Sequence, residues 1–320
     1  MCMPTRTRLL LAKDLDPVPR CEFLTAGSGA ASGCLLLANT DHHTNLFVLD
    51  CATLKLRQVP GLSDMETPFP RAHGMACGTV TGEDRLFLAE GRYDHVKWGK
   101  LKGTSHATFV VERGGSFGDE GSAEMTEPHK ICLSRGELWI VRGGDNHEPF
   151  ITVVQAATGT KTGHIPASDL GAPVSGPPGL HVRGLALSNE EAFVVTGTEA
   201  KVAAKVFSRE ERTDLVAVTS VQSYMGEEDP TEVGKGYAFQ REIELPTSCM
   251  HLAWHNGLLF VCCRESSDLQ VINAVDGKLM HSILLETGFP ISTAVVVPTN
   301  EDKDEVVVLD SVGNLHFFHI

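Results

Sequence analysis

The apolar and polar positions of this chain repeat in a unit of a short strand, a turn and a second, strongly apolar strand. Short apolar runs that are bounded by turn residues are typical of β-strands rather than helices. Clear copies of the first strand, with a His, an Arg or a Met at the entrance, lie at 73–77, 129–133, 183–187 and 250–254. The copies follow one another about every 50 to 65 residues, which is close to the period of a β-propeller blade.

The second strand of the unit predicts the number of blades. Apolar second strands lie at 34–38, 86–89, 138–141, 193–196, 259–262 and 305–309. The last unit ends one strand short, whereas residues 6–12 form a spare strand before the first unit. Pairing these two ends removes two open sheet edges. We therefore expect an all-β, six-bladed β-propeller with four-stranded blades, in which the N-terminal strand closes the last blade and residues 1–320 form a single domain.

Two stretches depart from the regular spacing, at 91–105 and 197–213. Insertions in repeat proteins map to loops, so we expect both stretches to be long loops between second and third strands. Loops on a rigid scaffold often carry function. In this position they would restrict access to one face of the propeller.

Composition narrows the classes of partner. The formal charge of −14 disfavours binding to nucleic acid or to an anionic membrane, because both require a basic surface. The nine cysteines form no Cys-x-x-Cys pair, which indicates free thiols in a reducing compartment. The apolar run at 9–12 is too short for a signal peptide, and no run is long enough to span a bilayer. We therefore expect a soluble, cytoplasmic protein without nucleic-acid or membrane partners.

Several His and Arg residues fall at places that converge in a propeller. The innermost strand of each blade starts beside the axis at one face of the disc, and the loop between the second and third strands returns to that face. The strand entrances carry His73, His129 and Arg183, with His181 and His251 close by. The loops and the strand ends before them carry His42, Arg92, His95, Arg142, His147 and Arg264. One face would therefore collect a cluster of His and Arg side chains.

This cluster predicts an axial funnel that binds a small anionic ligand. Imidazoles from neighbouring blades can bind a divalent metal ion, which would activate water or polarise a carbonyl group. We therefore interpret His73 and His129 as metal ligands or acid/base groups, and His181 and His251 as auxiliary catalytic groups. Arg183, Arg92, Arg142 and Arg264 would bind the anion through bidentate hydrogen bonds. His42, His95 and His147 would also take part in binding the ligand. The chemistry would be that of a metal-assisted hydrolase, lyase or isomerase.

The same residues support a second hypothesis. Inner-strand His and Arg side chains can simply satisfy buried backbone carbonyls, and the protein would then be a noncatalytic scaffold that holds a protein partner. Two other features are weaker evidence for a functional site. The Gly-rich stretch 27–33 lacks the following helix of a phosphate loop. Because Cys262 and Cys263 are adjacent strand residues, they point to opposite faces, so at most one of them could join His251.

Parts of the sequence resemble a known group of proteins. The runs Pro-His-Lys-Ile at 128–131, Gly-Glu-Leu-Trp-Ile-Val at 136–141 and His-Gly-Met-Ala at 73–76 resemble the Pro-x-Gly-Ile-Ala and Gly-x-Leu-Tyr-Val pattern of six-bladed propellers such as the NHL-repeat and gluconolactonase-like groups. The lactonase group places Glu, Asn and Asp around its metal, whereas the corresponding column here holds His73, His129, Arg183 and Met250. The resemblance therefore implies the fold rather than the chemistry.

Overall fold

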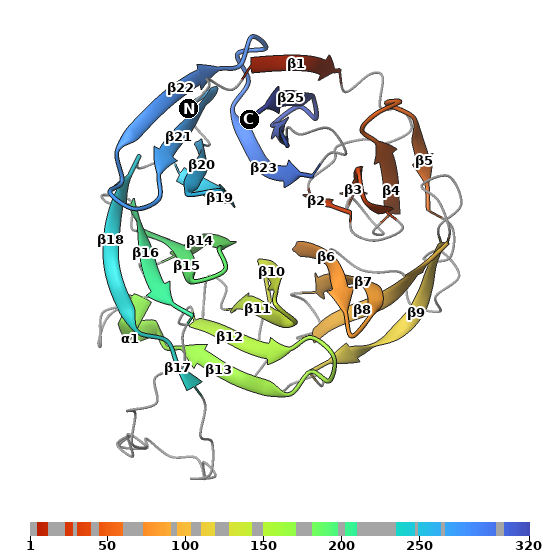
Figure 1. Cartoon of the computed structure of the whole chain (residues 1–320), viewed down its shortest axis with the longest axis vertical. Helices are drawn as coiled ribbons and strands as arrows, with labels where there is room; N and C mark the ends of the chain where they lie inside the picture. Colours follow the sequence, from red (N-terminus) through yellow and green to blue (C-terminus); the bar gives the residue numbers. More distant parts are fainter. Residues whose placement is uncertain are drawn as a thin grey trace.

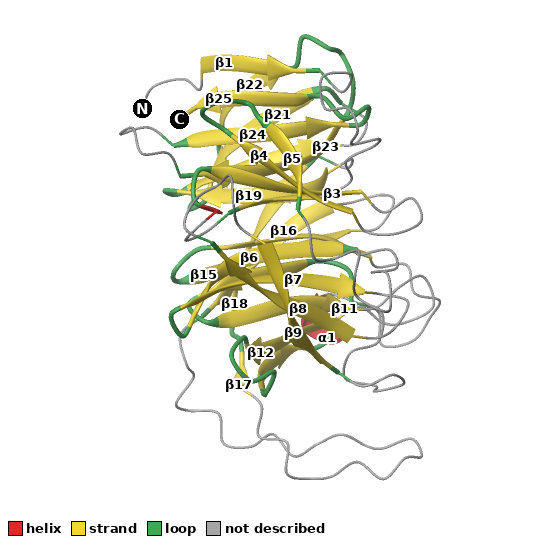
Figure 2. Ribbon diagram, turned by 90° about the vertical axis from the view of Figure 1, so that its right-hand side faces the viewer, coloured by secondary structure: helices red, strands yellow, loops and turns green. Residues whose placement is uncertain are grey.

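The computed structural model arranges the chain as a ring of six β-sheets, the blades, around a central axis (Figure 1). The strands run from one face of the disc to the other (Figure 2). The structure describes residues 5–11, 23–27, 31–39, 45–59, 73–90, 95–103, 110–118, 128–142, 150–170, 181–197, 202–209, 235–246, 249–263, 266–298 and 304–320. The expected all-β, six-bladed propeller is confirmed.

Each blade contains four antiparallel strands, and the first of them lies nearest to the axis. The innermost strands of blades 1 to 6 are β2 (Phe23–Ala26), β6 (Gly74–Val80), β10 (Ile131–Ser134), β14 (His181–Leu187), β19 (Cys249–His255) and β23 (Ile291–Val297). The second strands are β3 (Cys34–Asn39), β7 (Glu83–Glu90), β11 (Glu137–Arg142), β15 (Glu191–Gly197), β20 (Leu258–Cys263) and β24 (Glu305–Asp310). The third strands are β4 (Asn45–Asp50), β8 (His95–Lys102), β12 (Phe150–Gln155), β16 (Val202–Ser208), β21 (Asp268–Asn273) and β25 (Leu315–His319).

The outer strands are β5 (Leu56–Gln58), β9 (Val110–Phe117), β13 (Lys161–Ile165), β18 (Phe239–Leu245), β22 (Leu279–Leu284) and, in blade 6, β1 (Thr5–Leu10). Two short elements accompany blade 3. The short helix α1 (Ala167–Leu170) follows β13, and β17 (Lys235–Gly236) pairs with β13 in parallel. Blade 3 therefore has a fifth strand at its outer edge.

The core consists of apolar layers between neighbouring blades rather than one central cluster. In β3, Leu36 packs with residues of blade 2, whereas Leu35 and Leu37 pack with residues of blade 6. Among the described residues six such clusters occur, one for each pair of neighbouring blades. A strand that is buried on both faces reads as a continuous apolar run. For this reason the six second strands could be recognised in the sequence, and all six are confirmed.

The prediction of two long loops at 91–105 and 197–213 is wrong. Each stretch contains the third strand of its blade, because β8 pairs with β7 and β16 pairs with β15 along their lengths. In β8, buried positions such as Val96 and Leu101 are separated by Lys, Trp and Gly, which weakens the period-2 signal. Residues 95–102 and 202–208 therefore cannot act as gating loops over a face.

The N-terminal strand closes the ring, as expected. Strand β1 pairs antiparallel with β25, from Thr5↔His319 to Leu10↔Leu315. The innermost strand β2 contacts both β6 and β23, so blade 1 also packs against its two neighbours at the axis. The last blade is thus assembled from the two ends of the described chain (Figure 1).

An arginine fastens this closure. The guanidinium of Arg8 donates hydrogen bonds to the Cys51 carbonyl of blade 1 and to the buried carboxylate of Glu305 at the start of β24. It also lies 4.5 Å from the centroid of the Phe317 ring, within the range of a cation–π contact. One side chain of β1 therefore connects blade 6 to blade 1.

The same contact recurs at two other blade interfaces. Arg85 of blade 2 donates to the Ala156 carbonyl of blade 3 at 3.1 Å, and Arg241 of blade 4 donates to the Ala274 carbonyl of blade 5 at 2.8 Å. Each acceptor lies in the turn after a third strand. Each arginine also pairs with a glutamate at the start of the second strand of its own blade, and the three glutamates are Glu83, Glu191 and Glu305.

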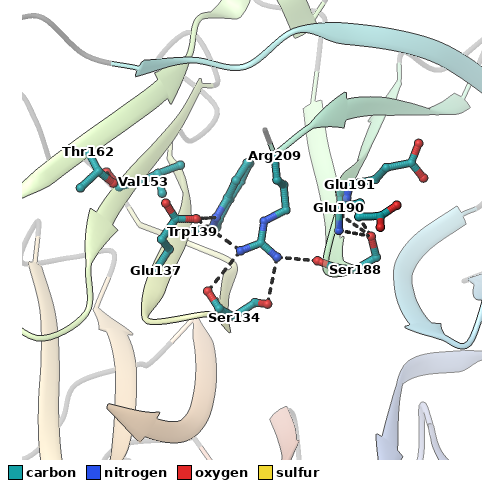
Figure 3. Close-up of polar contacts among 9 residues, drawn as sticks. All are labelled: Ser134, Glu137, Trp139, Val153, Thr162, Ser188, Glu190, Glu191 and Arg209. Carbon is teal, nitrogen blue, oxygen red and sulfur yellow. Dashed lines mark hydrogen bonds and ion pairs between the residues drawn. The ribbon is translucent and has the colours of Figure 1, made fainter. Parts of the chain in front are cut away.

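Between blades 3 and 4 the arginine reaches back from blade 4 to the preceding blade, whereas the other three arginines reach forward to the next blade in the ring (Figure 3). Arg209, just after β16 of blade 4, reaches Glu137 at the start of β11 with a distance of 3.3 Å. It also donates to the Ser134 hydroxyl at 2.9 Å and to the Ser188 carbonyl. We refer to Arg8, Arg85, Arg209 and Arg241 as the inter-blade arginine clamps.

Replacing Arg8 with alanine is predicted to destabilise the ring. The variant leaves the carboxylate of Glu305 buried without its guanidinium partner, which costs about 3 kcal/mol for a typical buried pair. The measurement is urea unfolding at neutral pH. As the control, Lys102→Ala removes the exposed ion pair with Glu112 and should change the free energy of unfolding by less than about 1 kcal/mol. Equal stabilities of the two variants would contradict this role of Arg8.

Candidate functional site

The starts of the innermost strands and the ends of the second strands lie at one face of the propeller, which we name the entrance face. The His73 amide donates to the Ala89 carbonyl at 2.8 Å, and the His129 amide donates to the Val141 carbonyl at 2.9 Å. These two bonds are equivalent in blades 2 and 3. His73 and His129 therefore occupy equivalent places in neighbouring blades.

The two imidazole rings meet at this face. Their centroids are 5.0 Å apart, with an angle of 77° between the ring planes. The backbones approach closely as well, because a Cβ atom at Gly74 would lie 2.3 Å from the His129 carbonyl oxygen. The predicted equivalence of the positions of His73 and His129 is therefore confirmed. Their roles as metal ligands or acid/base groups stay predictions.

His251 of blade 5 is buried near the axis, where the charge of Lys130 of blade 3 acts on it. Burial, together with the charge of Lys130, lowers the pKa of His251 to about 3, against a weaker opposing hydrogen bond with the backbone of Ala294. The Nδ1 atom of His251 is buried and has no hydrogen-bond partner. Burial also lowers the pKa of Lys130. The imidazole is therefore neutral in the folded protein at physiological pH.

Lys130 is a residue that sequence reasoning missed. It follows His129 directly, but its charge acts on His251 in a blade that is not a neighbour, and no local pattern indicates such an effect. Between these blades lies β14, where a Cβ atom at Gly184 would come within 3.1 Å of the His251 Cα. A glycine at this place lets the innermost strands of blades 4 and 5 approach closely.

Arg183 lies in β14, on the same side of the ring. Burial raises the pKa of the Cys249 thiol, and Arg183 is close enough to oppose that increase. His181 is the first residue of β14, where its backbone pairs with Gly197, but its side chain lies outside the described part. The ligand-binding role of Arg183 and the catalytic role of His181 stay predictions.

Arg142 lies at the end of β11 and is only 1% exposed. Its guanidinium is 3.9 Å from the centroid of the Phe150 ring and donates to the Thr152 hydroxyl at 3.2 Å. Both contacts are to β12 of the same blade. The side chain is thus held inside the protein, and its predicted role as an anion clamp is not tested by these contacts.

We had expected His95 to lie in a loop, but it is the first residue of β8. Its Nε2 atom lies 2.6 Å from a carboxylate oxygen of Glu90, which also lies 3.0 Å from the Lys97 ammonium. Glu90 is fully buried at the end of β7. Sequence reasoning missed Glu90, because the apolar run before it gives no sign of a buried charge.

A third charged residue, Asp310, is buried at the equivalent strand end in blade 6. Its carboxylate accepts hydrogen bonds from Asn314 Nδ2 at 2.7 Å, from the Thr287 hydroxyl at 3.1 Å and from His316 Nε2 at 3.2 Å. Burial alone would raise the pKa of Asp310, but these hydrogen bonds lower it. The network fastens residues 286–290 to the turn after β24.

Four predicted ligand-binding residues, His42, Arg92, His147 and Arg264, lie outside the described residues. Within the ranges that the structure describes, no three or more His, Cys, Asp or Glu side chains form a group that could hold a metal ion. In the same ranges, no helix is long and apolar enough to cross a membrane.

Two sequence features that could suggest a nucleophile lie in ordinary strands of the propeller. Cys263 packs between blades 4 and 5 whereas Cys262 packs between blades 5 and 6, so the two thiols do point to opposite faces. The chain also contains a Gly-x-Ser-x-Gly sequence at 114–118, which we had not singled out. Ser116 lies in the outer strand β9, and not at the turn from a strand to a helix that a nucleophile elbow requires.

Comparisons with known proteins identify the fold. No protein-family model matches the chain, and no curated protein matches it in sequence. Among solved structures, the chain is similar to one in a nidogen–laminin complex, with a TM-score of 0.57 and 11% identity over 88% of this chain and 86% of that one. It is also similar to Sqt1 of Saccharomyces cerevisiae, with a TM-score of 0.52 and 11% identity over 95% of this chain and 73% of that one.

A third similar structure is the β-propeller domain of Cps50 (Swd1) of Myceliophteria thermophila, with a TM-score of 0.50 and 8% identity over 99% of this chain and 100% of that one. At these identities the likeness shows the fold alone. The propeller architecture is therefore supported, whereas the resemblance to the NHL-repeat and gluconolactonase-like groups is not confirmed at the level of the family.

The neutral His251 is predicted to make stability depend on pH. Because its pKa is lowered from 6.5 to about 3 in the folded protein, the unfolded chain binds a proton below pH 6.5 that the folded chain does not bind. Stability should therefore fall as the pH decreases from 6.5 toward 3. Well below pH 6.5, this residue alone contributes a slope of about 1.4 kcal/mol per pH unit.

Urea unfolding of the wild type and of His251→Asn at pH 6.5, 5.5 and 4.5 measures this contribution. The free energy of unfolding of the variant should fall less steeply than that of the wild type. Lys130→Met should keep a slope close to that of the wild type, because burial, the larger cause of the lowered pKa of His251, remains. Identical slopes for the wild type and His251→Asn would refute the assignment.

Proposed function

We propose that this protein is a noncatalytic interaction scaffold that binds another protein through the outer rim of blades 4 to 6. One observation carries the proposal. In the part that the structure describes, every large apolar side chain that is strongly exposed belongs to these blades or to the loop between blades 5 and 6. These side chains are Phe239, Val275, Leu279, Leu284, Phe289 and Val312.

Four of the six lie within 275–289, the outer hairpin of blade 5 and the loop that follows it. Single apolar residues on a surface are ordinary, but a local concentration of them marks an interaction site. The hairpin belongs to a ring that the inter-blade arginine clamps hold together. A rigid platform loses little conformational entropy when a partner binds, which favours affinity.

The similar structures support the proposal that this protein binds another protein. One of them is a complex of nidogen with laminin, in which a propeller of this fold occurs together with a protein partner. Because the identity is only 11%, the likeness says nothing about which partner this chain binds.

Cross-linking with an amine-reactive reagent in cells that produce the protein tests the proposal. We expect one protein at near-stoichiometric yield, cross-linked through Lys278 in the hairpin of blade 5. Lys55 of blade 1 and Lys102 of blade 2 are exposed control lysines far from this hairpin in the ring and should give few cross-links. A chain that remains alone, or cross-links confined to the control lysines, would count against the scaffold.

A second candidate function is binding of a small anionic ligand at the entrance face, and the effect of Lys130 on His251 favours it. Lys130 and Arg183 both exert their charge among the innermost strands of an otherwise acidic protein. Cations among these strands favour the binding of a phosphate or carboxylate group. Metal-assisted hydrolytic, lyase or isomerising chemistry through His73 and His129 stays a prediction that depends on this binding.

Thermal unfolding in phosphate or citrate tests the second candidate. A ligand present at 100 times its dissociation constant stabilises the folded state by about 2.7 kcal/mol. The wild type should therefore gain several degrees in melting temperature, and Lys130→Met should lose that gain. Lys102→Met has the same change of charge at an exposed site of blade 2 and should keep it. An equal gain in both variants would mean that the anion binds elsewhere.

A further inference from the structure

The outer strand of blade 5 lacks the protection that the other outer strands carry. Each of the other five contains at least one charged residue, and examples are Arg57 in β5, Glu112 in β9, Lys161 in β13, Arg241 in β18 and Arg8 in β1. Strand β22 reads Leu-Met-His-Ser-Ile-Leu and contains no Lys, Arg, Asp, Glu or Pro. Charged residues and Pro are the usual means by which proteins prevent an edge strand from pairing with another chain.

The side chains of β22 are also unusually exposed. Leu279 is 51% exposed and Leu284 is 69% exposed. Leu279, Ser282 and Leu284 pair with alternate residues of β21, Ile272, Gln270 and Asp268, so they lie on the same face of the sheet despite the irregularity between Val271 and Ile272. This face is turned toward blade 4, because Ile272 packs in the layer between blades 4 and 5.

The backbone of β22 is available for pairing along its outer side. Among the described strands, β22 pairs only with β21 and ends the order of its sheet. The same propeller shows that an outer edge can accept another strand, because β17 adds to the outer edge of β13 in blade 3. In Figure 1, β22 lies at the periphery of the ring, as β13 does.

Charge indicates the chemistry of the partner. In the described residues 266–298, which include β22, the charged side chains are Asp268, Asp276, Glu286 and a single basic residue, Lys278. The whole chain carries a formal charge of −14. A second copy of this chain would bring the same negative charge, whereas a basic segment would be attracted.

We infer that β22 is a strand-addition site for an extended segment of a partner protein in which apolar residues alternate with Lys or Arg. The inference rests on the proposed scaffold function and specifies how the partner is held. Main-chain hydrogen bonds to the free edge of β22 supply affinity, and apolar side chains of the segment cover Leu279 and Leu284. Basic residues of the segment lie next to the acidic surroundings.

The probe is a fluorescent seven-residue peptide of alternating Val and Lys, titrated into the full chain at low ionic strength and followed by anisotropy. We expect saturable binding, and at least tenfold weaker binding of a Val/Glu peptide. A Val/Lys peptide whose amides along one edge are N-methylated cannot donate hydrogen bonds to β22 and should also bind at least tenfold more weakly. Hydrogen exchange should show new protection of the amides of 279–284 when the unmodified peptide binds.

Leu284→Lys places a charge on the edge and should weaken peptide binding at least tenfold. Val275→Lys is the matched control, because it makes the same change of charge at a 72% exposed site in the turn before β22 and should bind like the wild type. Both side chains are exposed, so equal melting temperatures should verify that both variants fold. Equal weakening by the two variants, or protection outside 279–284, would overturn the inference.

Two further measurements separate the possible failures. If a cellular partner binds Leu284→Lys as tightly as it binds the wild type, the strand-addition site is wrong while the scaffold stands. If light scattering shows a dimer of the wild type that Leu284→Lys dissociates, the edge is occupied by a second copy, which also overturns the inference. A wild type without any cellular partner would instead refute the scaffold itself.

Discussion

The packing of blade against blade is the constraint on which the rest of this structure depends. Each blade is apolar on both faces and buries them only against two neighbours, so no blade is stable until the ring is closed. The inter-blade arginine clamps reinforce this packing. At three interfaces a guanidinium joins the glutamate that starts a second strand to a carbonyl in the next blade, and at a fourth Arg209 makes the contact from the opposite side. The glutamate at the start of a second strand is common to all four contacts, whereas the arginine does not always come from the same strand of the blade.

The same constraint explains the buried charges of the entrance face. Second strands end in Glu90, Arg142 and Asp310, all nearly inaccessible to solvent, and each is held by neighbouring polar or aromatic groups. A buried charge without a partner costs several kcal/mol, so such groups must be compensated locally. Charged residues that converge at one face of a propeller are therefore weak evidence for catalysis. His251 differs, because its Nδ1 atom is buried without a hydrogen-bond partner while the charge of Lys130 acts on the ring.

The architecture could be predicted from the sequence because it depends on local patterns. Second strands are apolar on both faces, and the spare strand at the N-terminus matches the strand missing from the last blade. Strands β8 and β16 were mistaken for loops, because half-buried Lys residues and the small buried Gly and Ala residues obscure the alternation. The positions of candidate site residues could be predicted only where they follow the repeat, as for His73 and His129. Lys130, Glu90 and Asp310 depend on contacts between strands or blades that no spacing in the sequence specifies.

Blade 5 combines a solvent-exposed apolar strand with a fold in which every other outer strand carries a charge. An unprotected edge favours aggregation, so the exposed Leu279 and Leu284 are a liability for an isolated protein. Substituting a charged residue for either side chain would remove that liability with little loss of packing, because both are more than half exposed. An apolar edge at this one blade is the feature on which the proposed partner site rests. The hydrogen bond of Arg241 to the Ala274 carbonyl, in the turn that leads into β22, connects this turn to blade 4, so the edge is held in place without any partner.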